Sequence, residues 1–549
     1  MRVRILPVAL VCLVALPAVA RPADDKKADK KPSQPTVIIR LKSLDGLLAD
    51  VKYLAALAGR GDEVKNFEGI LKARAGGDKA LEGFDRKRPL GAYGHPGPQG
   101  VDSTVVLMLP VKDEKAALRA LDNFNLKAEK EKDGSYSVTP EGAPFSIYFR
   151  FANQYVYITP RDPDAIAPGN LLKPEDVLPE GQTGLASVTV RLDQIDPKAK
   201  EAAVAQLDLQ MAELKDKQTG DLTELQKALS DQIAREVANR IKAVITEGRE
   251  LTLKADVDRK KGDLHLDLSV DGQPGSKLAG SIKDLGRAKS VFGGLTGKDS
   301  AANVLFHYLL PEKVRQSMGP ALEEAFKKAQ ADEKDDKKRE LSEKLYKALA
   351  PTLKSGDLDL AADVRGPSKD GTYTLVAAAK VRDGEAVEQG IKEVIKELPE
   401  EAKGLVTLNA EKAGSVRIHK IDAEQFYDED ARKMFGKGPI WFAVSNNMAV
   451  LAAGEDALKA LKDALALEPK AARTLQAEVS LKRLAPLMAK EHKAAPKAAE
   501  EAFKAPHDDT IRLTLEGGQS LRLRASMKAA VIKFFHLLEE AQKDSAAEK

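Results

Sequence analysis

Two ten-residue stretches of this chain follow the same pattern, and this repetition constrains the fold more than any other sequence feature. Residues 188–197 and 477–486 align without a gap at an offset of 289, and in both an alternating strand runs into Leu-x-x-(Ile/Leu)-x-Pro. Three further segments recur in the same order, at offsets of 270, 293 and 257. Because a repeated order of segments implies a repeated order of structural elements, the sequence predicts a tandem duplication.

The segment that recurs at an offset of 270 is a strand followed by a helix. Residues 105–109 and 375–379 are apolar strands, and each leads into Val-(Lys/Arg)-Asp and then a helical pattern. Asp113 and Asp383 are candidate N-caps, because a carboxylate there can accept hydrogen bonds from free N–H groups of the first turn. A structural role therefore accounts for both aspartates.

A hairpin follows in both copies, over residues 147–158 and 441–451. Asn153 and Asn446 coincide in this alignment and stand in the turn. Asparagine tolerates the positive φ that tight hairpins need. We therefore expect the same turn in both copies.

The strand at residues 186–192 alternates apolar Val188 with polar Ser187 and Thr189. This period of two is typical of an antiparallel sheet with one solvated face. We therefore expect an α+β fold made of two tandem copies of an antiparallel-sheet unit, with helices packed on one face.

The repeated segments place the two copies at residues 37–298 and 299–545. The offset between corresponding segments falls from 289 to 257. This fall predicts a helical insertion at about 200–247 in copy one alone, where apolar residues recur every fourth position.

The N-terminus has the features of a secretory signal peptide. Residues 1–20 combine basic Arg2 and Arg4, a short apolar stretch and a cleavage site ending at Ala20. Residues 21–36 are rich in Lys, Asp, Ala and Pro, which predicts a flexible leader. We therefore expect an exported protein of the periplasm or cell surface, secreted without a transmembrane span after cleavage.

Cysteine content and charge exclude several classes of function. Cys12 is the only cysteine and lies in the predicted signal peptide, so the mature chain would have no disulfide, thiol nucleophile or thiolate-bound zinc. Basic and acidic residues number 87 and 84, and such balance argues against nucleic-acid binding. No cofactor is expected.

Catalytic motifs are missing from the sequence, and the candidate polar sites are weak. His507 and Asp509 could converge on a metal ion, since residues two apart on an extended chain share a side; a polar turn is the simpler interpretation. The alternating aspartates Asp357, Asp359 and Asp363 could do acid–base work, but a solvated strand face explains them more simply.

Aromatic residues gather on the two corresponding hairpins. Tyr148, Tyr155 and Tyr157 lie on one of them, and Trp441 lies on the other. These four are candidate contacts for a glycan, lipid or peptide ligand on an exposed aromatic surface. An ordinary aromatic core is the alternative interpretation.

Residues 88–93, the Val-(Lys/Arg)-Asp helix starts and residues 275–279 resemble segments of uncharacterised exported bacterial proteins that contain an internal duplication. The resemblance implies no activity and no site.

Three hypotheses on function remain open. The first is a non-enzymatic exported binding or scaffold protein with an unknown protein, glycan or lipid partner. The second is a carrier of a lipid-like amphiphile, held in an apolar pocket between sheet and helices. The third is a metal-dependent hydrolase that uses His507 and Asp509.

Overall fold

The computed structural model describes residues 34–547 except 75–81, 96–103, 123–125, 141, 143–144, 180, 182–183, 218–223 and 423. The predicted signal peptide and most of the predicted leader lie outside the described residues. The chain forms two compact units. Unit 1 takes its described residues from 1–209, 241–279 and 526–539, and unit 2 takes its own from 210–240, 280–525 and 540–549.

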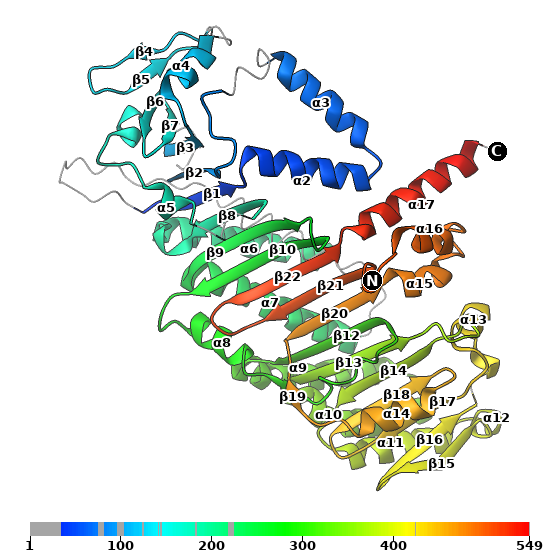
Figure 1. Ribbon diagram of the computed structural model, residues 1–549. Coiled ribbons are helices and arrows are strands. Elements are labelled where there is room, and N and C mark those ends of the chain that lie inside the picture. The colour runs from blue at the N-terminus through cyan, green and yellow to red at the C-terminus, as the bar shows by residue number, and fades with distance from the viewer. Residues whose placement is uncertain are drawn as a thin grey trace. The chain divides into compact units, whose positions relative to one another are not determined.

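Unit 1 is built on an antiparallel sheet in which the strands lie in the order β4-β5-β6-β7-β3-β2-β1-β8-β9-β10 (Figure 1). These strands are Val37–Leu41 (β1), Leu90–His95 (β2), Thr104–Pro110 (β3), Glu129–Lys130 (β4), Tyr136–Val138 (β5), Ile147–Ala152 (β6), Tyr155–Pro160 (β7), Ala186–Arg191 (β8), Gly248–Asp258 (β9) and Asp263–Gly272 (β10). Their β-branched and aromatic residues suit a pleated, half-buried surface.

The first helices of the chain belong to unit 1. They are Leu44–Leu57 (α2), Gly61–Arg74 (α3), Glu114–Asp122 (α4), Pro174–Val177 (α5) and the short 3-10 turns Pro163–Ile166 (η2) and Leu192–Gln194 (η3). Three more helices contribute residues to both units: Pro197–Lys217 (α6), Glu224–Glu247 (α7) and Lys277–Leu285 (α8). The helical character predicted for about 200–247 is thus present in α6 and α7.

The strands of unit 2 pair antiparallel in the order β15-β16-β17-β18-β14-β13-β12-β20-β21. These strands are Ser300–Leu309 (β12), Asp357–Arg365 (β13), Thr374–Lys380 (β14), Val406–Ala413 (β15), Val416–Ile421 (β16), Ile440–Val444 (β17), Met448–Ala453 (β18), Leu475–Ser480 (β20) and Thr510–Glu516 (β21). A small second sheet pairs Lys289–Ser290 (β11) with Lys470–Ala471 (β19). The strand Leu521–Lys528 (β22) follows β21.

The helices and helical turns of unit 2 lie between its strands along the chain. They are Glu312–Asp332 (α9), Asp336–Ser355 (α10), Gly384–Glu397 (α11), Glu400–Lys403 (α12), Glu424–Phe426 (η4), Glu429–Phe435 (α13), Ala457–Leu465 (α14), Leu481–Met488 (α15) and Ala495–Ala502 (α16). The last helix, Ala530–Ala547 (α17), contributes residues to both units. Among the helices that the structure describes, none combines the length and apolar character that crossing a membrane would require.

The mixed α+β class and the antiparallel pairing predicted from the sequence are confirmed. The nine strands in the unit 2 order also correspond one for one to the first nine strands in the unit 1 order. Starting from β4 and from β15, each order passes through two hairpins, three central strands and then the strand in which the ten-residue repeat begins, β8 or β20. A helix pair also follows the first central strand in each unit, namely α2 and α3 after β1, and α9 and α10 after β12.

Both predicted helix caps are confirmed, and one of the two hairpin turns differs from the prediction. The Asp113 carboxylate accepts a hydrogen bond from the Ala116 N–H at 3.0 Å, and Asp383 accepts one from Ala386 at the same distance. Asn153 has the expected positive φ of 52°. Asn446 does not have a positive φ, because three residues connect β17 to β18 whereas two connect β6 to β7.

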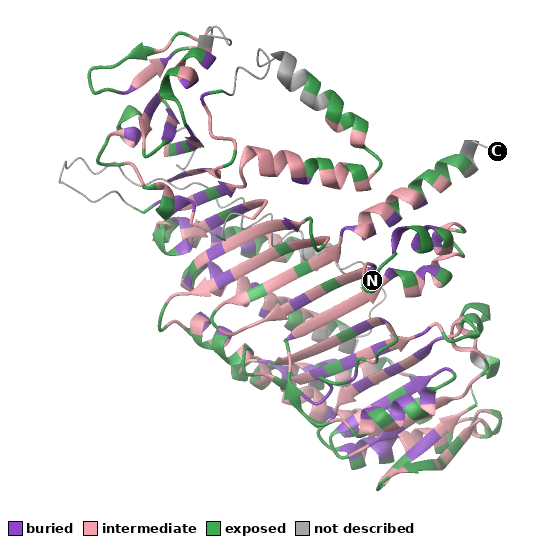
Figure 2. Cartoon of the chain, viewed as in Figure 1, coloured by how far each residue is buried: buried purple, intermediate pink, exposed green. Residues whose placement is uncertain are grey.

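The expectation that helices pack on one face of each sheet is wrong for unit 2. Neighbouring residues of a strand point to opposite faces. Val450 packs in the core beneath α14, while Ala449 packs beside Ile391 of α11 on the other face. Figure 2 shows buried residues gathered where α14 lies on the sheet. Both faces are apolar, so both can take a helix.

The polarity expected for β8 is reversed. Ser187 and Thr189 are buried, whereas Val188 is 37% exposed. The buried Arg40 of β1 explains this arrangement, because its guanidinium donates to the Thr189 hydroxyl at 2.6 Å and to the Val177 carbonyl at 2.7 Å. The polar side of β8 therefore satisfies a buried cation beneath α5, and the apolar side faces away from it.

Candidate ligand-binding pocket

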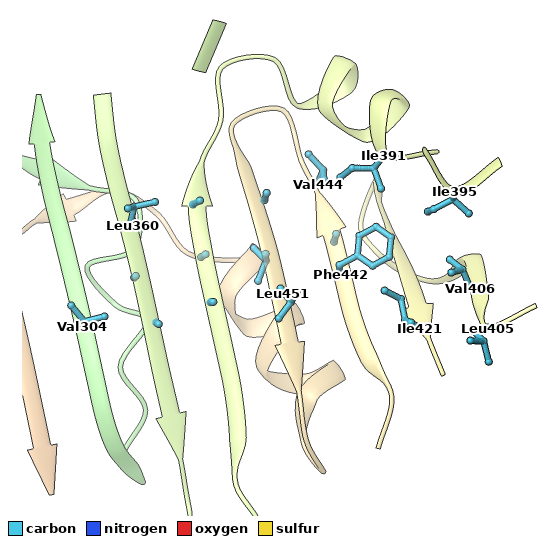
Figure 3. A pocket seen from close by; sticks show the side chains of 18 of the residues that line it. Val304, Leu360, Ile391, Ile395, Leu405, Val406, Ile421, Phe442, Val444 and Leu451 are labelled. Carbon is cyan, nitrogen blue, oxygen red and sulfur yellow. The ribbon is translucent and has the colours of Figure 1, made fainter. Parts of the chain in front are cut away.

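Unit 2 contains an apolar pocket of about 920 Å³ between its sheet and the helices α11 and α12 (Figure 3). Six neighbouring strands supply the sheet wall, through Val304, Phe306, Leu360, Ala362, Ala377, Ala379, Ala449, Leu451, Phe442, Val444 and Ile421. The helical wall consists of Ile391, Ile395, Leu398, Ala402 and Leu405, with Val406 at the start of β15. All the described residues that line the pocket are apolar, so it offers contact surface without side-chain hydrogen bonds.

The amphipathic pattern of α11 positions its wall of the pocket. Val387, Ile391 and Ile395 recur every fourth residue and so share one face of the helix. Val387 is buried against Val444 of β17, and Ile391 packs beside it. The cap at Asp383 sets where this helix begins. The helix is thus fixed to β17, and Ile395 extends the wall toward α12.

Part of the sheet wall is open to solvent. Val304, Leu360 and Leu451 are 41%, 46% and 40% exposed. Cross-strand pairing connects Val304 to Leu451 through alanines, since Val304 pairs with Ala362, which pairs with Ala377, which in turn pairs with Leu451. A contiguous exposed apolar surface beside a pocket is typical of a binding site. This open side gives a ligand access.

A buried histidine stands behind the aromatic side chain of the pocket. The ring of His419 packs on Phe442 with centroids 4.8 Å apart, and His419 is fully buried. Its Nδ1 accepts a hydrogen bond from the Asn409 N–H at 3.0 Å, while its Nε2 lies 3.3 Å from a Glu388 carboxylate oxygen. This geometry fits a neutral imidazole that carries its proton on Nε2.

Charged neighbours complete the cluster around this histidine. The Glu388 carboxylate pairs with Lys392 at 2.6 Å and with Arg417 at 3.0 Å. Burial raises the pKa of Glu388, but the hydrogen bonds from Lys392 and Arg417 outweigh it and the net pKa is lowered. Burial lowers the pKa of His419, against the opposite effect of Glu388. Near neutral pH the cluster therefore holds two cations and one carboxylate around a neutral imidazole.

The pocket face of unit 2 has a counterpart in unit 1, because cross-strand partners define the same row of residues in each sheet. In unit 1 the row is Leu253, Val188, Ile39, Ala92, Leu107, Ile158, Phe149 and Tyr136. In unit 2 it is Leu513, Ala477, Val304, Ala362, Ala377, Leu451, Phe442 and His419. Three of the aligned pairs, at Val188, Leu107 and Ile158, reproduce the offsets of 289, 270 and 293 found in the sequence.

Side-chain size differs between the units at these corresponding positions. The neighbouring row of unit 1 contains Leu109, Val156 and Phe151, where unit 2 has Ala379, Ala449 and Val444. Together with the change from Leu107 to Ala377, four positions carry a smaller side chain in unit 2. These four positions line the pocket.

In unit 1 three of the larger side chains, Leu109, Val156 and Phe151, pack in a hydrophobic cluster beneath α4, whereas Leu107 is 37% exposed. Phe149 stacks on Tyr136 with ring centroids 5.3 Å apart and meets Phe151 edge-on at 5.9 Å. Val156 is buried in the same cluster, and Ile158 packs against it. The cluster therefore occupies, in unit 1, the place that corresponds to the pocket end near Phe442.

The four aromatic candidates from the sequence lie away from this pocket. Tyr155 and Tyr157 are 1% and 0% exposed, and their hydroxyls donate to the carbonyls of Pro89 at 3.0 Å and Leu172 at 2.8 Å. Tyr148 packs against the same core. These contacts are those of core residues, the alternative that the sequence left open.

Trp441, the fourth aromatic candidate, lies on the opposite face of β17 from Phe442. It packs against the hydrophobic core that includes α14.

His507 and Asp509 have separate surroundings. His507 is exposed with a φ of 66°, whereas Asp509 is buried. The Asp509 carboxylate accepts hydrogen bonds from the Ser480 hydroxyl and from the Lys482 N–H at the start of α15. Within the described part of the chain, no group of three or more His, Cys, Asp or Glu side chains is arranged to hold a metal ion.

The expected solvated face of β13 is also buried. Asp359 accepts a hydrogen bond from the Ser290 hydroxyl at 2.6 Å. Asp363 accepts from the Gly297 N–H at 2.7 Å and from the Arg365 guanidinium at 2.8 Å. The two carboxylates thus hold the segment that precedes β12.

Sequence reasoning missed the residues that line the pocket, although the signal was present. The alignment at an offset of 270 sets Leu107 and Leu109 against Ala377 and Ala379. A drop in side-chain size at two alternate positions of one strand indicates a local loss of packing volume on one face. Alanine has no polar group, so a search for chemical motifs passes over it.

Comparison with known proteins gives no relatives for this chain. No family model matches it, and searches of curated proteins and of solved structures return no match.

Proposed function

We propose that this chain is an exported, non-enzymatic carrier of a lipid-like amphiphile, and that the pocket of unit 2 holds the hydrocarbon part of the ligand. The observation that carries the proposal is the set of smaller side chains along one sheet face, at positions where unit 1 has larger ones and packs three of them in a hydrophobic cluster. The pocket volume of about 920 Å³ lies within the usual range for small-molecule sites.

The polarity of the lining favours hydrocarbon over other ligands. Each methylene that leaves water for an apolar site contributes about 0.8 kcal/mol. A hydroxyl or amide that enters without a hydrogen-bond partner costs about 1–3 kcal/mol. A glycan, with many hydroxyls, is therefore disfavoured in this lining. The polar head of an amphiphile would remain at the open side, where Val304 and Leu360 meet solvent.

The metal-dependent hydrolase is the less favoured alternative. Asp509 already accepts hydrogen bonds from Ser480 and Lys482, and His507 is exposed. The general binding or scaffold hypothesis is made more specific by the pocket.

We also propose that the two units arose by tandem duplication. Support comes from the matching strand orders and from the agreement of cross-strand positions with the sequence offsets. Export to the periplasm or cell surface rests on the signal-peptide pattern of residues 1–20.

Equilibrium dialysis with radiolabelled hexadecanoate tests the function. The unaltered chain is expected to bind about one hexadecanoate in the unit 2 pocket. The double substitution Ala377→Leu and Ala379→Leu places the residues of unit 1 in the pocket and is expected to weaken binding at least about tenfold, since 1.4 kcal/mol is tenfold. Circular dichroism checks that the variant is folded.

The reciprocal variant is the control. Leu107→Ala with Leu109→Ala changes the corresponding positions of unit 1 and is expected to leave hexadecanoate affinity unchanged. Absence of binding by the unaltered chain, or equal binding by the pocket-filling variant, would refute the proposal.

A further inference from the structure

We infer that the ligand of the unit 2 pocket is a single flexible hydrocarbon chain of about 16–20 carbons, lying across the strands. This inference rests on the proposed function and specifies the ligand class. It excludes a rigid fused-ring lipid and an extended peptide as the preferred occupant.

The floor of the pocket runs perpendicular to the strands. Its residues come from β12, β13, β14, β18, β17 and β16, from Val304 at one end to Ile421 at the other, and Figure 3 shows their side chains spread across these strands. Neighbouring strands lie about 4.8 Å apart, so the five intervals span about 24 Å. An extended chain advances about 1.2 Å per backbone atom, so about 20 atoms fit this length.

Alanines form the middle of this floor. Ala362 pairs with Ala377, and Ala379 pairs with Ala449, so two pairs of small residues lie side by side on β13, β14 and β18. Leu360 and Leu451 stand beside them with larger side chains. The small alanine side chains therefore make the middle of the floor lower than the leucines beside it, and the floor forms a trough.

The lining of the trough disfavours an extended peptide. An extended peptide would bring N–H and C=O groups into a lining that offers no side-chain partners, at a cost for each group.

Sheet twist distinguishes a flexible chain from a rigid ring system. Adjacent strands of a sheet are rotated by about 20–25° relative to each other. The direction in which the floor faces therefore turns by roughly 100° over the five intervals. A chain with free single-bond rotation can follow such a surface, whereas a planar fused-ring body contacts only part of it. The same apolar lining therefore favours an acyl chain over a sterol.

A competition series tests this inference. Saturated fatty acids of 8 to 24 carbons, together with cholesterol, displace radiolabelled hexadecanoate from the full chain. Affinity is expected to rise about threefold to fourfold for each added methylene up to about 16–20 carbons and no further, and the length at which the rise stops is the length optimum. Cholesterol is expected to bind at least about tenfold more weakly than the optimal acid, because it contacts less of the floor.

Substitutions within the trough should shift the length optimum. Ala377→Phe blocks the middle, so the optimum is expected to fall by several carbons. Leu451→Trp, at a position that is already 40% exposed, gives the same test if the first variant does not fold. Leu107→Phe, at the position of unit 1 that corresponds to Ala377, is the control and should leave the length profile unchanged.

The outcomes separate the two proposals. If no fatty acid binds, the proposed function fails. If fatty acids bind without a length optimum, or if cholesterol binds as tightly as the best acid, the proposed function stands and the single-chain inference is overturned.

Discussion

The aromatic cluster around Phe149 in unit 1 and the pocket beside Phe442 in unit 2 occupy corresponding places in the strand orders of the two units. One place is packed with large side chains and the other is hollow. The difference lies in four side chains, while backbone pairing is shared. It teaches that strand order and register can be kept while a few side-chain volumes decide whether a sheet face is core or site.

The pocket of unit 2 is accompanied by a loss of buried apolar surface. Each alanine that stands in place of a leucine gives up buried apolar surface, and the opposite face of the unit 2 sheet remains densely packed beneath α14. A domain can accept such a loss on one face when the other face supplies its core. The following predictions test this division of roles.

The largest expected effect comes from truncating the two matched phenylalanines. Phe149→Ala removes a buried ring from a packed cluster and should lower the free energy of unfolding of unit 1 by about 3–5 kcal/mol. Phe442→Ala should cost clearly less in unit 2, because that ring is partly exposed and adjoins existing space. Denaturant unfolding of each variant measures both losses, and equal losses would break the comparison.

A reciprocal exchange at one position should change stability in opposite directions. Leu109→Ala should cost unit 1 about 2–5 kcal/mol, because it leaves a cavity beneath α4. Ala379→Leu should stabilise unit 2 by about 1 kcal/mol, because the new side chain buries apolar surface in space already available. Thermal and denaturant unfolding report both changes. Marked destabilisation by Ala379→Leu would indicate that the pocket region has no spare volume.

The buried histidine should make unit 2 sensitive to mildly acidic pH. Burial lowers the pKa of His419 below its ordinary value of 6.5. The His419 imidazole is therefore protonated at a higher pH in the unfolded chain than in the folded chain. The stability that the neutral imidazole contributes is fully present above about pH 6.5 and is lost progressively as the pH falls below that value. Protonation would also remove the Nδ1 acceptor used by the Asn409 N–H.

His419→Tyr is the matched variant, because unit 1 has Tyr136 at the corresponding position. The difference in stability between the unaltered chain and this variant should change with pH between about 5 and 7. A constant difference across this range, measured by denaturant titrations at several pH values, would contradict the assigned role of His419.

The smallest effect should be the same in both units. Asp113→Ala and Asp383→Ala each remove a helix cap with the same 3.0 Å hydrogen bond. Each should lower stability by about 1 kcal/mol. A clear inequality between the two losses, in urea unfolding followed by circular dichroism, would show that the shared scaffold is not energetically equivalent.

The sequence predicted what depends on local pattern. Asp113 and Asp383 were placed as caps, the hairpins were placed on their strands, and the antiparallel pairing followed from alternation. These features are encoded within short segments and in backbone chemistry, so they can be read without knowledge of distant contacts.

What failed depends on partners far along the chain. Thr189 is buried because Arg40 donates to it, and Asp363 is buried because the Gly297 N–H approaches it. Alternation correctly separated the two faces of β8, yet it could not say which face is covered. The pocket was missed for a related reason, because Ala377 and Ala379 have meaning only beside the leucines of unit 1.

The most direct test of the central claim is a crystal structure of the full chain with 16-bromohexadecanoate, in which the anomalous signal of bromine locates the end of the chain. We predict one acyl chain across the strands of unit 2, in contact with Ala377, Ala379 and Phe442. A crystal in which these side chains close together without a ligand, or in which bromine lies only outside this pocket, would contradict it.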